Sequence, residues 1–169
     1  MPRTAIYAGS FDPVTHGHLD VARRATNLFD RLIIAVGENP KKRYTLPLQT
    51  RLAVLAEVFS DLPTVEIRPF HGLLVHFCRD TGAVAIVRGL RAVTDFEFEF
   101  QIGLANMDMA PQVETVFLLT EPKNIFISSS LVKEIASNGG DVGRYLPAPA
   151  HQALMSALAA AAVDGTPRA

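Results

Sequence analysis

The sequence predicts a single α/β domain: a Rossmann-like, five-stranded parallel sheet with helices on both faces and a C-terminal helix. Five short β-rich runs are mostly apolar throughout instead of alternating, as is typical of strands buried on both faces of a parallel sheet. Segments with helical spacing separate these runs, and such alternation indicates an α/β fold. The chain has 169 residues, of which 49% are hydrophobic, which is enough for one domain with a full core.

Each predicted strand is followed by a predicted helix. The strands are expected at residues 5–8, 32–36, 65–70, 83–87 and 115–119. The helices are expected at about residues 17–29, 48–59, 73–79, 94–107 and 129–137, with an alanine-rich helix at about 149–162 after the proline-containing linker 146–149. We assign residues 1–163 to the domain and expect residues 164–169 to form a frayed tail.

The segment from Phe96 to Phe100 fits two kinds of element. Phe96, Phe98 and Phe100 alternate with two glutamates, a period of two that indicates a half-buried strand. In a helix, Phe96, Phe100 and Leu104 would instead form one apolar stripe. We favour the helix, because the parallel strands on either side of this segment need a crossover connection between them.

Charge and cysteine content exclude several classes of function. Lys plus Arg number 16 and Asp plus Glu number 17, so a formal net charge of -1 provides no overall field that would gather nucleic acid or an anionic membrane. We therefore expect no nucleic-acid partner and no membrane partner, and a polyanion must meet a local cationic site. A single cysteine, Cys78, is typical of a reducing compartment, and the first residues lack the apolar stretch of a signal peptide. These features predict a cytoplasmic protein.

The residues after the first predicted strand have the composition of a phosphate-binding loop. Residues 9–18 are Gly-Ser-Phe-Asp-Pro-Val-Thr-His-Gly-His and lead into a helix. Ligands of open parallel sheets bind beyond the carboxyl ends of the strands, where this segment lies. Its glycines permit close approach of the backbone, and Ser10 and Thr15 offer hydroxyl groups. His18 falls in the first helical turn, where free N–H groups and the helix dipole favour an anion. The segment matches neither a P-loop nor a dinucleotide fingerprint, because both spacings are missing.

Polar residues also follow the fourth and fifth predicted strands. Arg88 and Arg91 place two guanidinium groups at a strand end, a position suited to bidentate phosphate binding. Three consecutive serines at 128–130 precede a helix. From the spacing to the residues that follow, Ser129 or Ser130 is the expected N-cap, but three serines exceed what one cap requires. The sequence thus predicts anion-binding groups at the ends of three strands.

The segment Thr15-His16-Gly17-His18 resembles the signature motif of a nucleotidyltransferase superfamily. From about residue 6 to residue 154 the chain is similar to the bacterial pantetheine-phosphate adenylyltransferases of that superfamily, and several separated motifs agree. The resemblance implies transfer of the adenylyl group of ATP to 4'-phosphopantetheine, giving 3'-dephospho-CoA and pyrophosphate in coenzyme A biosynthesis. It also implies Mg2+ carried by the ATP phosphates, no metal-binding residues in the protein itself, and a homohexamer.

The resemblance further implies roles for individual residues. His18, Lys42 and Arg91 are expected to be catalytic. The residues expected to bind the acceptor are Ser10, Lys42, Leu74 and Arg88. The residues expected to bind ATP are Ser10, Phe11, His18, Gly89, Leu90, Arg91, Glu99, Asn124, Ile125, Phe126, Ile127, Ser128, Ser129 and Ser130. Two positions depart from the family pattern, since Phe98 stands where tyrosine is common and Ala8 where proline is frequent.

Two alternative functions are open. An adenylyl- or cytidylyltransferase that acts on nicotinate mononucleotide or glycerol phosphate would share the Thr-x-Gly-His loop, and a non-catalytic nucleotide-sensing module could use the same fold. The motifs at 88–91 and 128–130, together with Leu74, favour pantetheine as the acceptor. The presence of His18 together with Lys42 and Arg91 favours a catalytic protein over a nucleotide-sensing module.

The remaining histidines and the cysteine are interpreted as structural. His71, His76 and His151 have no partners at the spacing of a metal site. Cys78 has no surrounding motif that would indicate a nucleophile, so we expect a core thiol.

Overall fold

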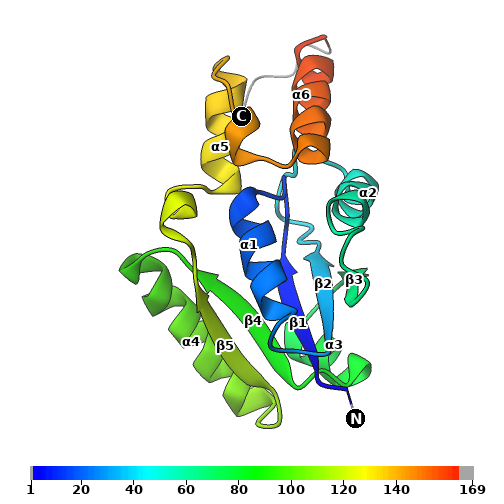
Figure 1. Ribbon diagram of the computed structural model, residues 1–169, viewed down its shortest axis with the longest axis vertical. Helices are drawn as coiled ribbons and strands as arrows, with labels where there is room; N and C mark the ends of the chain where they lie inside the picture. The colour runs from blue at the N-terminus through cyan, green and yellow to red at the C-terminus, as the bar shows by residue number, and fades with distance from the viewer. Residues whose placement is uncertain (1, 164–169) are drawn as a thin grey trace.

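The computed structural model describes residues 2–163, apart from the side chains of residues 93 and 94. It contains a five-stranded sheet in which all neighbouring strands are parallel, in the order β3-β2-β1-β4-β5 (Figure 1). The strands are β1 (Thr4–Gly9), β2 (Arg31–Gly37), β3 (Val65–Phe70), β4 (Ala85–Leu90) and β5 (Glu114–Leu119). β1 is the central strand, where Ile6 pairs with Ile33 of β2 on one side and with Ile86 of β4 on the other. The predicted α/β class with a parallel sheet is confirmed.

Helices cover both faces of the sheet. α1 (His16–Ala25), α2 (Leu48–Val58), α5 (Ser129–Ser137) and α6 (Ala148–Val163) contribute to the core on one face, and α3 (Leu74–Thr81) and α4 (Val93–Met109) pack on the other. Two short 3-10 segments, Pro122–Asn124 and Gly143–Tyr145, precede α5 and α6. α5 and α6 lie side by side at one end of the molecule (Figure 1). Within residues 2–163 we find no helix of the length and hydrophobicity needed to cross a bilayer.

The core is divided into two apolar layers by the sheet itself. Successive side chains of a strand point to opposite faces. In β1, Ala5 and Tyr7 belong to the layer beneath α1 and α2, whereas Ile6 and Ala8 belong to the layer beneath α3. Cys78 is fully buried in this second layer, as expected for a core thiol. Because both faces of the central strands are buried, the side chains in the interior of these strands are mostly apolar.

The predicted elements are all present, with different ends in several cases. β4 begins two residues later than expected and continues to Leu90, so Arg88 belongs to the strand and Arg91 directly follows it. α1 ends at Ala25 instead of residue 29, and α6 begins at Ala148, inside the expected linker. The expected frayed tail at 164–169 lies outside the described residues.

The segment from Phe96 to Phe100 is helical, as we favoured, and forms part of α4. Within the described residues its apolar stripe is only partly covered. Phe96, Phe100 and Leu104 are 41%, 46% and 45% exposed, although the Phe96 ring also meets Phe117 of β5. The helical period of the apolar residues therefore predicted the helix correctly. α4 packs on the sheet with only part of its surface, and the rest leaves apolar side chains exposed to solvent.

Candidate active site

A cleft of about 650 Å³ opens where β1 and β4 end. These adjacent strands are the point at which the order of the sheet reverses, since β1 leads to β2 on one side and β4 leads to β5 on the other. Open α/β sheets bind their ligands at such a switch point. The cleft is lined by Tyr7, Ala8, Gly9, Ser10, Thr15, Gly17, His18, Val21, Lys42, Arg88, Gly89, Arg91, Asp95, Phe98, Glu99, Thr120, Ile127, Ser128, Ser129 and Ser130.

His18 is held in one orientation by the start of α1. Thr15 is the N-cap, and its side chain accepts a hydrogen bond from the backbone N–H of His18. In return, the backbone N–H of Thr15 donates to Nδ1 of His18 over 3.0 Å, which completes a capping box. Because Nδ1 accepts this hydrogen bond, the proton of the neutral ring lies on Nε2. The His18 side chain therefore brings an N–H donor to the cleft.

The surroundings of His18 keep it uncharged. Burial of the ring, together with the positive charges of Arg91 and Arg88, lowers the pKa of His18 to about 4. The ring also packs edge-on against Phe11, with 5.2 Å between the ring centroids. In the ligand-free protein the ring is therefore a neutral hydrogen-bond donor at physiological pH, not an imidazolium ion.

The two arginines at the end of β4 are each paired with a carboxylate of α4. Arg88 donates from Nε and Nη2 to Glu99, over 2.6 and 2.5 Å, and from Nη1 to the carbonyl oxygen of Ala8. Arg91 is bound to Asp95 in the same bidentate manner, over 3.1 and 3.3 Å. Burial would lower the pKa of Arg88, but the hydrogen bonds and negative charge of Glu99 outweigh it and raise the pKa. Each guanidinium keeps N–H groups that these carboxylates do not use.

The loop between β2 and α2 brings a third cation to the cleft. Lys42 is exposed on this loop, and its Nζ donates to Oγ of Ser10 over 3.4 Å. Ser10 directly follows β1, and Lys42 lies beyond the end of β2, so the contact joins residues 32 positions apart. A lysine ammonium group and a hydroxyl at this distance can both donate hydrogen bonds to the same anionic group.

The start of α5 supplies hydroxyl groups and free backbone N–H groups. The N-cap is Ser128, whose Oγ accepts from the backbone N–H of Leu131, so the expected cap at Ser129 or Ser130 is wrong by one or two positions. Ser129 instead donates to the carbonyl oxygen of Pro13 and joins α5 to the loop after β1. Only one of the three serines caps the helix, and all three line the cleft.

The cleft brings together most, but not all, of the residues that the sequence singled out. Six of them do not line it: Phe11, Leu74, Leu90, Asn124, Ile125 and Phe126. Asn124 and Phe126 line a neighbouring cavity of about 680 Å³, between α1 and the 3-10 segments, and Ile127 borders both spaces. Phe11 is buried, with its ring against Tyr7 and His18. Leu74 packs at the start of α3 against the second apolar layer.

Sequence reasoning missed four side chains that line the cleft, namely Tyr7, Val21, Asp95 and Thr120. Thr120 directly follows β5, so the rule that ligand-binding residues follow strands could have found it. Tyr7 is the one aromatic residue of β1, and burial raises the pKa of its phenol, which keeps the hydroxyl protonated. Its place at the cleft depends on the pairing of β1 with β4 and has no local signal.

The charged groups of the cleft suit a polyanion. Three cations and the N-termini of α1 and α5 face it, whereas its two carboxylates, Asp95 and Glu99, are each bound to an arginine. The part of the chain that the structure describes holds no group of three or more His, Cys, Asp or Glu side chains that could bind a metal ion. This donor set fits a phosphate ligand that brings its own Mg2+, because Mg2+ is commonly held by substrate phosphates and water.

The sequence matches a known family over most of its length. The family model described as cytidylyltransferase-like matches residues 6–135. Two relatives named phosphopantetheine adenylyltransferase were found. The one from Caldanaerobacter subterraneus subsp. tengcongensis is 53% identical over 145 residues, which cover 86% of this chain and 91% of that protein. The one from Desulfatibacillum aliphaticivorans is 50% identical over 147 residues, which cover 87% and 84%.

A solved structure shares the fold at low sequence identity. The crystal structure of a protein from Vibrio parahaemolyticus, provisionally named a nicotinate-nucleotide adenylyltransferase, superposes with a TM-score of 0.70. The match covers 94% of this chain and 95% of that one, at 16% identity. At this identity the match shows the arrangement of strands and helices and does not extend to the substrate.

The lowered pKa of His18 predicts how stability depends on pH. Well above pH 6.5, the pKa of histidine in the unfolded chain, the ring is neutral in both the folded and the unfolded chain, so it does not change the free energy of unfolding. Between about pH 6.5 and pH 4 the unfolded chain binds a proton that the folded chain does not, so the free energy of unfolding falls as the pH falls. Urea unfolding at a series of pH values should show a shallower fall for His18→Gln than for the parent. The exposed His76 provides the control, and His76→Gln should follow the parent. An NMR titration in which His18 changes protonation near pH 6.5 would contradict this prediction.

Proposed function

The chain belongs to the cytidylyltransferase-like family of nucleotidyltransferases, and from this premise we propose that it transfers the adenylyl group of ATP to 4'-phosphopantetheine. The products are 3'-dephospho-CoA and pyrophosphate, and the enzyme is a pantetheine-phosphate adenylyltransferase of coenzyme A biosynthesis. The observation that carries the proposal is the sequence identity of 50% or more to two proteins named phosphopantetheine adenylyltransferase. Each match covers most of this chain and most of the relative. A cleft in which cations and two helix N-termini converge supports binding of the phosphates that such a reaction requires.

The reaction is a displacement at the α-phosphorus of ATP. An oxygen of the acceptor phosphate attacks this phosphorus, a new P–O bond forms, and the bond to the leaving pyrophosphate breaks. The acceptor is a phosphate monoester with a second pKa near 6, so it is already largely a dianion at neutral pH and needs no general base. Catalysis then depends on positioning and on stabilising charge, which fits a cleft whose carboxylates are both neutralised by arginines.

We assign the acceptor side of the reaction to the ends of β1, β2 and β4. Ser10, Lys42 and Arg88 would hold the acceptor phosphate, and the 3.4 Å contact between Lys42 and Ser10 supports a shared phosphate. Arg88 would use the N–H groups that Glu99 and Ala8 leave free. Leu74 would lie against the pantetheine arm, as the resemblance implies. It is the first residue of α3, three positions after His71, which borders a small cavity that is also lined by Lys42.

We assign the nucleotide side to α1, the residues at 89–91 and the segment leading into α5. The Nε2–H of His18 would donate to the α-phosphate, and Arg91, Ser129 and Ser130 would hold the leaving pyrophosphate. The remaining nucleotide contacts would come from Phe11, Gly89, Leu90, Glu99, Asn124, Ile125, Phe126, Ile127 and Ser128. A Cβ atom on Gly89 would lie 3.0 Å from Val21, so a larger residue at this position would crowd a side chain that lines the cleft.

We also propose that the nucleotide arrives as its Mg2+ complex and that the protein acts in the cytoplasm. A divalent ion on the phosphates would neutralise part of their charge during the reaction. The cationic side chains and helix N-termini of the cleft would hold the rest. A cytoplasmic location is supported by the single cysteine, which is buried and unpaired in the second apolar layer.

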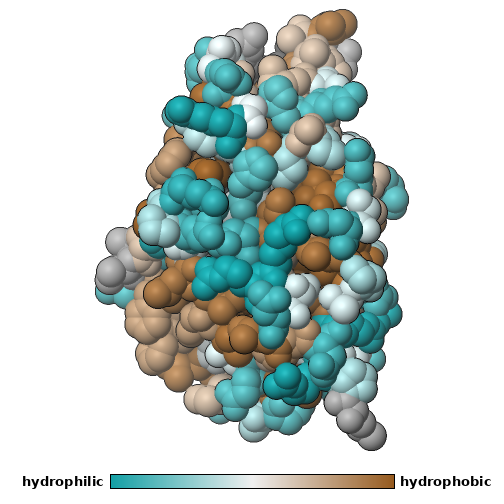
Figure 2. Space-filling view, viewed as in Figure 1, coloured by the Kyte–Doolittle hydropathy of each residue, from teal (hydrophilic) through white to brown (hydrophobic). Residues whose placement is uncertain are grey.

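We further propose that the protein forms homohexamers. Large apolar side chains are exposed along α4 and the end of β5, namely Phe96, Phe98, Phe100, Leu104, Met107, Met109 and Leu119. They contribute to a hydrophobic area over α4 and β5, seen at the lower left of Figure 2. Apolar patches of this kind mark interaction surfaces, and a second copy of the chain is the partner proposed here. The number six comes from the resemblance alone.

The first prediction of this proposal concerns the acceptor. With ATP, 4'-phosphopantetheine should yield a product with the mass of 3'-dephospho-CoA and an equal amount of pyrophosphate. Unphosphorylated pantetheine should yield neither, because it lacks the phosphate assigned to Lys42 and Arg88. Nicotinate mononucleotide and glycerol phosphate are the comparison acceptors. Equal turnover of pantetheine and its phosphate, or turnover of a comparison acceptor alone, would refute the proposal.

The second prediction concerns His18. If its Nε2–H strengthens a contact only as charge grows on the α-phosphate, His18→Ala should lower kcat about 10²- to 10³-fold while ATP affinity stays within a few-fold. The substitution also opens the capping box with Thr15, so we expect a loss of about 1 kcal/mol of stability, and kcat must be expressed per folded molecule. His76→Ala is the exposed control and should behave as the parent. A near-parental kcat would remove His18 from the mechanism.

The third prediction concerns assembly. Light scattering of the parent at micromolar concentration should give a mass six times the 18.4 kDa of one chain. Leu104→Asp should dissociate the assembly, because it places a charge on the apolar surface of α4. Leu28 is also 45% exposed but lies in the turn after α1, so Leu28→Asp is a matched control that should stay hexameric. A monomer mass for the parent would overturn the proposal.

A further inference from the structure

The side chain of Arg51 is buried beneath the loop that carries Lys42. It lies in the first turns of α2, and only 1% of the residue is exposed. It does not line the cleft, so it has no direct contact with a bound substrate. Neither the sequence motifs nor the roles assigned above involve this residue. A buried guanidinium outside the site therefore calls for a physical explanation.

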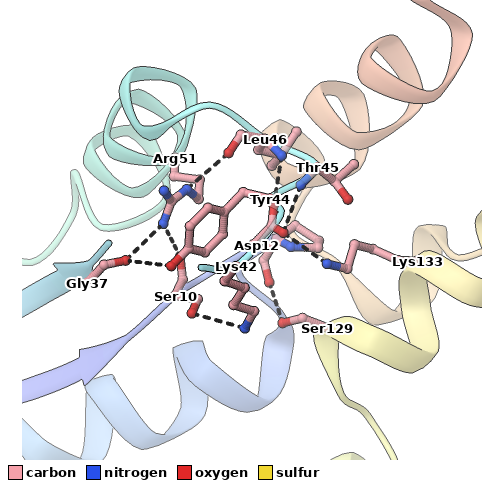
Figure 3. Close-up of polar contacts among 11 residues, drawn as sticks. Ser10, Asp12, Gly37, Lys42, Tyr44, Thr45, Leu46, Arg51, Ser129 and Lys133 are labelled. Atoms are coloured by element: carbon pink, nitrogen blue, oxygen red, sulfur yellow. Dashed lines mark hydrogen bonds and ion pairs between the residues drawn. The ribbon is translucent and has the colours of Figure 1, made fainter. Parts of the chain in front are cut away.

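Arg51 connects three segments that meet at the acceptor side of the cleft (Figure 3). Its Nη1 donates to the carbonyl oxygen of Ser10 over 2.8 Å and to that of Gly37 over 3.3 Å. Its Nε donates to the carbonyl oxygen of Leu46 over 3.1 Å. The three acceptors lie directly after β1, at the end of β2, and at the far end of the loop that follows β2. One rigid group thus fixes both ends of the Lys42 loop relative to Ser10.

The same guanidinium supports the interior of the loop. The ring of Tyr44 stacks on Arg51, with 4.1 Å between the ring centroid and Cζ of the arginine. The hydroxyl oxygen of Tyr44 accepts from the backbone N–H of Asn39 over 2.8 Å, and the backbone N–H of Lys42 donates to the carbonyl oxygen of Asn39 over 2.9 Å. Lys42 is therefore carried by a turn whose shape depends on a ring packed against Arg51.

Asp12 holds the same loop from the opposite side. It is 2% exposed, and its carboxylate accepts from the backbone N–H groups of Thr45 and Leu46 over 3.0 and 2.8 Å. Its remaining partner is Nζ of Lys133 in α5, over 2.9 Å. Figure 3 shows Arg51 and Asp12 on two sides of the segment that leads from Lys42 to Leu46.

Among the described residues, the charge of Arg51 is only loosely paired, by a single ion pair with Glu38. Its Nη2 forms no hydrogen bond, and the nearest carboxylate oxygen, from Glu38, is 3.7 Å away. A buried charge that is incompletely paired costs free energy, and an apolar side chain of similar size would often stabilise the fold as well or better. What an apolar side chain could not provide is a planar set of donors to three carbonyl groups of separate segments.

We propose that Arg51 is a positioning residue for adenylyl transfer, which fixes the loop between β2 and α2 so that Lys42 meets Ser10 at the acceptor phosphate. The inference rests on the proposed function, since it assigns Arg51 to the acceptor side of that reaction. Its loss should weaken the use of the acceptor and leave nucleotide binding unchanged, because the hydrogen bonds and ion pair of Arg51 in the described structure all go to residues outside α1 and the start of α5.

The test compares Arg51→Gln with the parent enzyme. We expect kcat/KM for 4'-phosphopantetheine to fall about 10- to 100-fold, since small displacements of a positioning group cost rates of this order. The dissociation constant of a non-hydrolysable ATP analogue should stay within about two-fold. Val54→Ala is the matched control, because Val54 lies one turn further along α2, is buried in the core, and touches no part of the Lys42 loop through a polar contact. Its activity per folded molecule should equal that of the parent.

A double-mutant cycle with Lys42→Ala separates positioning from a general loss of structure. If Arg51 acts through Lys42, Arg51→Gln should change kcat/KM less than about three-fold once Lys42 is absent. An equal fall in both backgrounds, or a parallel loss of nucleotide affinity, would overturn the inference. Near-parental kcat/KM for folded Arg51→Gln would overturn it as well.

Two further variants keep the test decisive if Arg51→Gln does not fold. Arg51→Lys retains the charge but not the planar donors, so it should reproduce the loss of acceptor efficiency. Tyr44→Phe removes the contact of the ring hydroxyl with Asn39 while Arg51 stays in place, and it should lower kcat/KM for the acceptor by a few-fold. Parental values for both variants would refute the proposal. A parent that adenylylates a different phosphate acceptor would refute the proposed function instead, and the same comparison would then be made with that acceptor.

Discussion

The parallel pairing of β1 with β4 determines where ligands can bind in this protein. The chain leaves β1 toward β2 on one side and continues from β4 toward β5 on the other, so the segments after these strands separate and leave a crevice. The loop after β1, the arginines at the end of β4 and the start of α5 all border this crevice. Two helices, α1 and α5, begin there, and their free N–H groups face the same space. One topological constraint thus assembles the proposed phosphate-binding site from segments that are distant in sequence.

A site for polyanions must hold several cations close together before its ligand arrives. These cations repel one another. Two carboxylates of α4 reduce the repulsion, because Glu99 and Asp95 pair with the two arginines at the end of β4. Burial and the same two arginines lower the pKa of His18, so its imidazole ring stays neutral and does not add to the repulsion. α4 therefore has two tasks: one side supplies carboxylates to the cleft, and another exposes the apolar surface that we assign to assembly.

The end of the sheet nearest the cleft is held by buried polar groups in addition to apolar packing. Loops at strand ends leave backbone N–H and carbonyl groups without strand partners, and each needs a hydrogen bond if it is buried. Asp12 accepts from two such N–H groups, and Arg51 donates to three such carbonyl groups. These directional contacts fix the loop of Lys42, whereas apolar contacts would only cover it.

The sequence by itself determined the local elements and the place of the site. The apolar runs predicted five buried strands, and the Thr-x-Gly-His segment predicted an anion-binding histidine in the first turn of a helix, because these signals depend on residues close together in the chain. The individual roles taken from resemblance stay predictions. Only the tertiary structure decided that Ser128 is the cap of α5, that α4 leaves its phenylalanines exposed, and that Arg51 reaches Ser10. The physical reason is distance along the chain: Arg51 and Ser10 are 41 positions apart, and no local pattern encodes a contact that exists only after the sheet has formed.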